Sequence, residues 1–213
     1  MSSQLRARDV KKPRIHITNI VAKTQLVPPF TLSSLESKHP FDHGDKYDPN
    51  LVFHGARITM SYRHTKFSLY RTGTVLSRAS RSPKELDKSF SWLSSFLSRF
   101  NLQLSDKYDI INIAAVSDFF CSFDLSALAD YLPPEFSYDP FPELSDKDDR
   151  EHLFDFITYH FHDTAPRYTA LIFPTGKVIF IGFKSIPVLE SHAHELSSFL
   201  SELSLNHPEV LVK

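Results

Sequence analysis

The hexapeptide LSSFLS occurs twice in this chain, at residues 93–98 and again at residues 196–201. The two copies lie 103 residues apart, and the dipeptides Thr72-Gly73 and Thr175-Gly176 have the same separation. Further landmarks recur in the same order: Asn19 with Asn112, Phe30 with Phe123, Leu35 with Leu128, Tyr47 with Tyr138, and Phe53 with Phe156. An ordered series of matches indicates that one unit of roughly 95 residues is used twice.

The landmarks also predict the domain boundaries. We expect a flexible basic tail at 1–14, a first repeat at 15–105, a second repeat at 106–205, and a C-terminal tail at 206–213. The repeats differ most after their Tyr-Asp-Pro motifs, where the second repeat carries an insertion at 141–152. This insertion is acidic, with Asp146, Asp148, Asp149 and Glu151 among its residues.

Composition and charge limit the class of protein. The chain has 213 residues, of which 41% are hydrophobic and 23% charged, as is typical of a soluble globular protein. Cys121 is the single cysteine, so no internal disulfide can form, and the polar, basic N-terminus is unlike a secretory signal. Residues 1–106 hold 17 Lys and Arg against 8 Asp and Glu, whereas residues 107–213 hold 7 against 17. This asymmetry favours different partners for the two repeats, with the basic one facing a polyanion; drift on solvated surfaces is the alternative.

Each repeat has the same pattern of expected elements. An opening strand (15–23 and 108–120) precedes a short helix, for which Thr31 and Asp124 are candidate N-caps. Three strands follow, at 52–60, 66–71 and 74–79 in the first repeat and at 154–161, 168–173 and 177–183 in the second; hairpin turns at the Thr-Gly dipeptides join the last two. An amphipathic helix closes each repeat, at 84–100 and 187–203. This order predicts an α+β fold, with helices on one face of an antiparallel sheet.

Catalytic and metal-binding patterns are weak. The eleven histidines form no Cys/His cluster with zinc spacing, and no serine lies in a nucleophile elbow. We therefore expect no enzyme activity, no cofactor and no metal site.

Several segments resemble the TATA-box-binding protein family. Residues 166–185, PRYTALIFPTGKVIFIGFKS, are similar to the strand, Ser/Thr-Gly-Lys turn, strand and Gly-x-Lys-Ser series of that family. The openings ITNIV (17–21) and IINIA (110–114) resemble the Asn-Ile-Val that starts each half of the family's repeat. The similarity covers about 15–205.

The resemblance implies a saddle related by a pseudo-two-fold axis, with a curved antiparallel sheet of ten strands and four helices on the convex face. Its concave face would lie on the DNA minor groove, where two aromatic side chains per half wedge between base steps and bend the duplex. Here those positions are Phe53, Tyr70, Phe156 and Phe173, and the second member of each pair comes 17 positions after the first. Aromatic residues in strands more often build a core, which is the structural alternative. Minor-groove binding by apolar wedges is a general mechanism, for which this family itself is a standard example.

The resemblance also implies other contacts with DNA. Asn19 and Asn112 match two central asparagines, whose amides suit the N3 and O2 acceptors of A·T pairs; a turn or bulge asparagine is the alternative. The apolar floor against the sugars would comprise Val21, Leu76, Ala114, Leu171 and Ile179. Phosphate contacts would come from Arg81, Lys177 and Lys184. The position in the first repeat that corresponds to Lys177 is Thr74, which carries no charge. Arg78 joins this surface, because it and Ile181 stand where the family has a groove-facing threonine.

Two functions stay open. The first is a general transcription initiation factor that binds A/T-rich promoter DNA and nucleates the preinitiation complex. Its expected partners are transcription factor IIB-like and IIA-like proteins and polymerase-associated factors, in the nucleus or in the cytoplasm of an archaeon. The second is a divergent saddle with little DNA affinity that acts as a protein-interaction module. It is favoured by residues 152–155, where HLFD replaces the family's usual Glu-x-Glu-Leu contact for transcription factor IIB.

Overall fold

The computed structural model describes residues 14–29, 58–70, 72–119, 121–138, 155–161 and 168–212. Their contacts divide the chain into an N-terminal unit, Ile17–Ile113, and a C-terminal unit, Ala114–Lys213, to which the chain up to His16 also belongs. The division agrees with the expectation of two units. The residue limits predicted for the repeats and tails stay a prediction.

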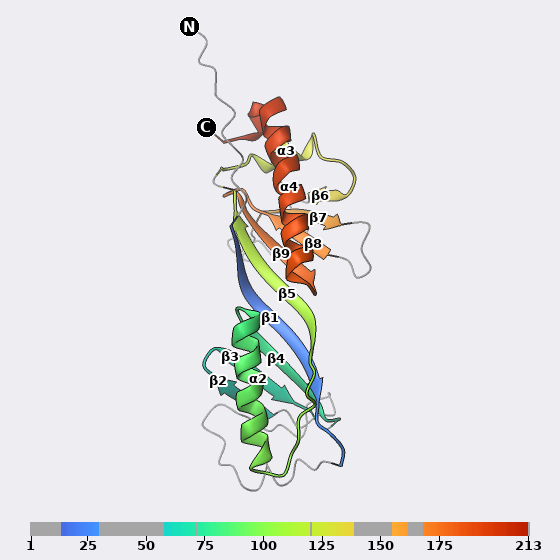
Figure 1. Cartoon of the computed structure of the whole chain (residues 1–213). Helices are drawn as coiled ribbons and strands as arrows, with labels where there is room; N and C mark the ends of the chain where they lie inside the picture. The colour runs from blue at the N-terminus through green and yellow to red at the C-terminus, as the bar shows by residue number, and fades with distance from the viewer. Residues whose placement is uncertain are drawn as a thin grey trace, which may run out of the picture. The chain divides into compact units, whose positions relative to one another are not determined.

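The described residues of the N-terminal unit form four strands that are covered by one long helix (Figure 1). The strand order is β2-β3-β4-β1, and its elements are β1 (Ile15–Gln25), β2 (Ile58–Tyr62), β3 (Thr65–Leu69), β4 (Thr74–Ser80) and α2 (Pro83–Ser98). Neighbouring strands are antiparallel. Helix α2 begins where the sequence provides a cap, because the Ser82 side chain accepts a hydrogen bond from the Glu85 N–H and Pro83 follows at the first helical position.

The C-terminal unit repeats this plan with strand order β5-β9-β8-β7-β6. Its elements are β5 (Asp109–Asp118), α3 (Leu125–Ala129), β6 (Phe136–Tyr138), β7 (Ile157–Phe161), β8 (Tyr168–Ile172), β9 (Lys177–Phe183), α4 (Ile186–Asn206) and a 3-10 turn, η2 (Pro208–Val210). Asp124 caps α3 as predicted, since its carboxylate accepts a hydrogen bond from the Ala127 N–H at 3.1 Å. Among the described residues, no helix is both long enough and apolar enough to cross a membrane.

One face of each sheet is buried against the long helix and the other is open. In β1, buried Ile20 and Ala22 alternate with half-buried Asn19 and Val21. The buried face of the N-terminal unit is aromatic, and Phe67 on β3 packs edge-to-face on Phe90 of α2 with ring centroids 5.4 Å apart. In β9, Val178, Phe180 and Phe183 are fully buried, while Ile179 and Ile181 between them are accessible. In β1, and in β9 up to Ile181, this period-two pattern separates a core face from an open face.

The hairpin turns have the same geometry in both units, which confirms the predicted turns at the Thr-Gly dipeptides. In the N-terminal unit the Tyr70 N–H donates to the Thr74 carbonyl at 2.9 Å, and in the C-terminal unit the Phe173 N–H donates to the Lys177 carbonyl at 2.9 Å. The turn glycines have φ angles of +81° at Gly73 and +76° at Gly176. This left-handed conformation is favourable for glycine and strained for other residues.

The predicted element counts need correction. The described residues contain nine strands and three α-helices, against the ten strands and four helices expected. The short helix expected at Thr31 and the acidic insertion at 141–152 lie outside the described residues. Strand β6 was not predicted, because its three residues are too few to show a strand period and they adjoin a turn motif. The long helices extend from Pro83 to Ser98 and from Ile186 to Asn206, close to the predicted bounds.

A second correction concerns the outer strands β2 and β7. Ile58 of β2 pairs with Leu69, whereas Ile157 of β7 pairs with Ile172. Leu69 and Ile172 are 103 residues apart but their partners are only 99 apart, because two residues connect β2 to β3 and six connect β7 to β8. The 103-residue offset of β3 and β8 therefore does not extend to the described residues of β2 and β7.

Candidate nucleic-acid interface

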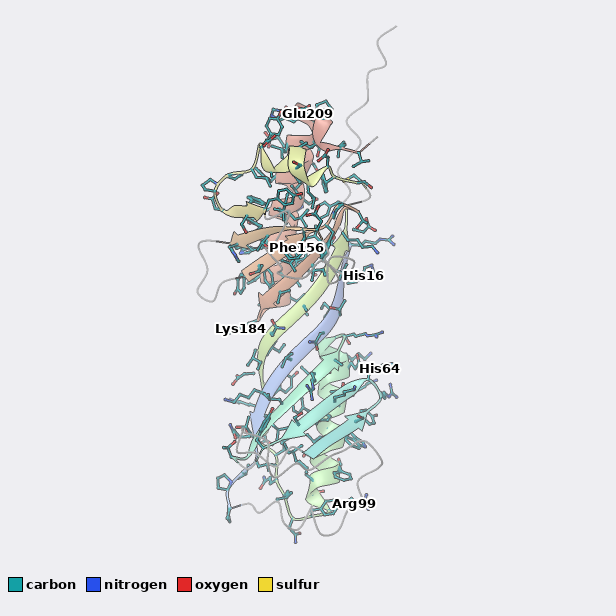
Figure 2. The ribbon with its side chains drawn as sticks, turned by 180° about the vertical axis from the view of Figure 1, so that it is seen from behind. His16, His64, Arg99, Phe156, Lys184 and Glu209 are labelled. Atoms are coloured by element: carbon teal, nitrogen blue, oxygen red, sulfur yellow. The ribbon has the colours of Figure 1, made fainter. Side chains whose placement is uncertain are left out.

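The open faces carry the predicted site residues that the structure describes. In the N-terminal unit Val21, Tyr70, Leu76 and Arg78 are half-buried and Arg81 is exposed. In the C-terminal unit Ala114, Leu171, Phe173 and Ile179 are half-buried, and Phe156, Lys177 and Lys184 are exposed. Figure 2 views the strands of each unit from the side away from its long helix, and Phe156 lies on this side of the C-terminal sheet. Phe53 lies outside the described residues.

Phe156 and Phe173 form an aromatic pair at one end of strands β7 and β8 in the C-terminal sheet. Their ring centroids are 5.7 Å apart and their planes are tilted by 50°. Phe156 directly precedes β7 and Phe173 directly follows β8, and the pairing of Ile157 with Ile172 brings the two rings together. Phe156 retains 37% of its accessible surface, so the pair is not part of the core. Two adjacent, accessible aromatic rings are suited to an apolar partner surface such as the face of a nucleic-acid base.

Asp155, which directly precedes Phe156, contacts β6. The Tyr138 hydroxyl donates a hydrogen bond to Oδ2 of Asp155 at 3.3 Å. Burial and the neighbouring Asp155 raise the pKa of Tyr138 above its usual value, so the phenol keeps its proton and stays a donor. Tyr138 therefore helps to position the residue next to Phe156. Sequence reasoning missed this contact because it depends on the unpredicted strand β6.

Asn19 lies at an irregularity between β1 and β4. Its Oδ1 accepts a hydrogen bond from the Ala79 N–H at 2.7 Å. The register of the two strands shifts between Ile20 and Ala22, and Ala79 has a φ of +69°. The alternative interpretation of Asn19 as a bulge asparagine thus accounts for the Oδ1 end of its amide. The Nδ2 group has two N–H donors, for which no described residue supplies an acceptor, so it can face a ligand on the open side.

Asn112 lies half-buried in β5, between accessible Ile111 and buried Ile113. Its neighbours alternate as they do around Asn19, because Ala114 is half-buried and Ala115 is fully buried. The two asparagines therefore occupy corresponding places in their strands.

The open faces also carry residues that sequence reasoning missed. On the N-terminal sheet, exposed Lys66 lies directly opposite Arg78. On the C-terminal sheet, His160 lies opposite Thr169, and its Nδ1 is 3.3 Å from the Thr169 Oγ1. Period-two alternation within 65–69 and 168–172 was the signal that could have identified Lys66 and Thr169.

Taken together, the fold and the site define a protein of two tandem α+β units, each with a sheet face opposite its long helix that bears accessible aromatic, apolar and amide side chains. The sequence profile of the family described as "Transcription factor TFIID (or TATA-binding protein, TBP)" matches residues 14–100 and 107–203. The chain therefore belongs to the TATA-binding protein family.

Individual relatives and a solved structure agree with this assignment. The TATA-box-binding protein of Thermoplasma volcanium is 25% identical over 198 residues, covering 92% of this chain and 98% of the relative. TATA-box-binding protein E of Halobacterium salinarum is 25% identical over 197 residues, covering 91% and 97%. The structure of Methanococcus jannaschii TBP matches with a TM-score of 0.71 at 21% identity, covering 89% of this chain and 99% of that one. The last match shows a shared fold.

Proposed function

We propose that this chain is a transcription initiation factor that binds A/T-rich duplex DNA through the minor groove and bends it. The observation that carries the proposal is the accessible pair of Phe156 and Phe173 on the open face of a chain that belongs to the TATA-binding protein family. The two rings would insert at one end of the site, and Tyr70 with Phe53 would insert at the other. Such wedges partly unstack a base step at a cost of a few kcal/mol, and the bent duplex then contacts more of the protein.

The rest of the open faces suits the same ligand. The minor groove offers mainly the N3 and O2 acceptors of A·T pairs, so the Nδ2 donors of Asn19 have acceptors there. Val21 and Leu76 in one unit and Leu171 and Ile179 in the other would contact the sugars. The exposed cations Arg81, Lys177 and Lys184 would neutralise phosphates and make binding dependent on salt.

The same proposal includes assembly. A DNA-bound member of this family would recruit transcription factor IIB-like and IIA-like proteins and polymerase-associated factors, wherever the cell keeps its chromosomal DNA. The differing charge of the two repeats, with 17 cations to 8 acids in residues 1–106 and 7 to 17 in residues 107–213, favours different partners for each.

A protein-interaction module is the second candidate, and one observation favours it. Ile181 is 38% exposed at a groove-facing position, where a hydrophobic side chain would suit a protein partner as well as a sugar.

A gel-shift and bending assay separates the two functions. The probes are a duplex with an A/T-rich core and a matched G/C-rich duplex, each labelled with a donor and an acceptor dye at its ends and titrated at two salt concentrations. We expect tight, salt-sensitive binding to the A/T duplex with an increase in energy transfer as the ends approach. Equal and weak binding to both duplexes, with no change in energy transfer, would favour the interaction module.

A further inference from the structure

The strongest remaining feature is the cationic pair that Lys66 forms with Arg78, a residue already expected on the DNA-contacting surface of the N-terminal unit. Lys66 of β3 lies directly opposite Arg78 of β4 in the antiparallel register. Like charges placed opposite each other across two strands destabilise a sheet. Among the described residues, no carboxylate forms an ion pair with either cation. The described residues therefore leave a repulsive pair of like charges without a neutralising carboxylate.

The side of the sheet on which the pair lies follows from its neighbours. Thr65 and Phe67, which flank Lys66, are both fully buried; Thr65 contacts Ser89 of α2, and Phe67 packs on Phe90. Lys66 therefore points away from the helix, onto the open face.

The guanidinium of Arg78 is fixed on this face. Its Nη2 donates to the Oγ of Ser68 at 3.1 Å, and Ser68 is 2% exposed. A guanidinium has five N–H donors, and this contact uses one of them. The buried hydroxyl therefore orients Arg78 and leaves donors for an anion.

The C-terminal unit lacks this pair. At the corresponding positions of β8 and β9, 103 residues later, Thr169 lies opposite Ile181. The two hairpins share their register, since Lys66 pairs with Arg78 and Ser68 with Leu76 in one, and Thr169 pairs with Ile181 and Leu171 with Ile179 in the other. The two hairpins therefore have matching backbone registers and differ in the side chains at these positions.

We infer that Lys66 and Arg78 together form a phosphate-binding site confined to the N-terminal unit, so that this unit holds the DNA backbone more strongly than its repeat does. The inference rests on the proposed function and deepens it. The attraction of two neighbouring cations to a duplex phosphate offsets the repulsion between them. Binding also releases counterions from the DNA. On a symmetric DNA site, a protein of two repeats can bind in two orientations. The cationic pair would favour the orientation that places the N-terminal unit on the half of the site with more negative charge.

The first test measures the salt dependence of binding. The variant Lys66→Thr/Arg78→Ile gives the N-terminal unit the residues of the C-terminal one, and Lys84→Gln/Lys88→Gln removes two exposed cations from α2 as a control of equal charge. Loss of two phosphate contacts should reduce the slope of log K against log salt by about 1.8, while the control leaves the slope near that of the wild type. Circular dichroism should show all three proteins folded.

The second test measures direction. The DNA has a palindromic A/T core between unlike flanks, and the phosphates of one half of the core are replaced by neutral methylphosphonates. A dye attached through Ser94→Cys in a Cys121→Ser background reports by energy transfer which half the N-terminal unit occupies. We expect that unit on the charged half, no preference after Lys66→Thr/Arg78→Ile, and a reversed preference when Thr169→Lys/Ile181→Arg is added. A wild-type protein that does not bind DNA would contradict both the proposed function and this inference. Binding with an unchanged slope and direction in the double variant would overturn the inference alone.

Discussion

The ring centroids of Phe156 and Phe173 lie 5.7 Å apart on the open side of the C-terminal unit, although β7, a six-residue connection and β8 lie between the two residues in the chain. Their proximity depends on the pairing of Ile157 with Ile172. Since Phe156 is 37% exposed, the pair is available to a ligand without unfolding any part of the sheet.

Truncating this pair should impair bending more than stability. Phe156→Ala removes a ring that is partly in water, so we expect a loss below about 2 kcal/mol in the free energy of unfolding, but a clear decrease in the bend angle. Phe180→Ala is the control, because Phe180 is fully buried and its truncation should cost about 3–5 kcal/mol. Urea unfolding and end-to-end energy transfer on a bound duplex measure the two quantities. A loss of stability at Phe156 as large as that at Phe180 would show that the ring serves the core.

Substitutions at Asn19 should separate its two functions. Asn19→Asp keeps an oxygen that can accept from the Ala79 N–H, but it removes the Nδ2 donors and adds a negative charge. The fold should therefore persist while affinity for A/T-rich DNA falls at least tenfold, which is about 1.4 kcal/mol. Asn19→Leu removes the acceptor and should cost about 1–3 kcal/mol of stability through the unpaired N–H. Parallel unfolding and binding titrations check both, and equal DNA affinity in Asn19→Asp and the wild type would contradict the groove contact.

Gly176→Ala should destabilise the C-terminal unit strongly. A Cβ at Gly176 would overlap the carbonyl oxygen of Cys121, and the residue has a φ of +76°. Because the obstacle is backbone and the conformation is left-handed, we expect a loss on the order of 3 kcal/mol. Thr175→Ala in the same turn is exposed and should change stability by less than about 0.5 kcal/mol. Thermal unfolding monitored by circular dichroism compares the two, and similar midpoints would argue against the close approach.

Tyr108 should make stability depend on alkaline pH. Burial, together with a 2.6 Å hydrogen bond from its hydroxyl to Oδ1 of Asp87, raises the pKa of Tyr108 from 10.0 to about 12. A group whose pKa is raised on folding contributes stability that is complete below the unfolded pKa and is lost as pH rises through the folded one. Tyr108→Phe should therefore be less stable than the wild type at pH 8, and the difference should shrink between about pH 10 and 12. Urea midpoints across this range test the prediction, and a constant difference would refute the link to ionisation.

The sequence by itself determined the features that arise from local patterns. An asparagine (Asn19 or Asn112), a Thr-Gly turn and LSSFLS follow one another in the same order in both halves, and this order identified two units. Each landmark could be recognised because it depends only on residues near it in the chain. Period-two and period-3.6 patterns located most strands and both long helices, since core-facing positions must be apolar at the spacing of the element. The cap at Asp124 followed for the same local reason.

Only the tertiary structure decided which residues meet across strands. The contact of Asn19 with Ala79 and the juxtaposition of Lys66 with Arg78 depend on register and on a strand irregularity, which nearby residues do not specify. The shorter β2–β3 connection shifts β2 by four residues relative to β7, so the 103-residue offset of β3 and β8 does not extend to the outer strands that pair with them. Side-chain alternation indicates which face a residue occupies, but cross-strand pairing, set by turns and long-range packing, determines its neighbours.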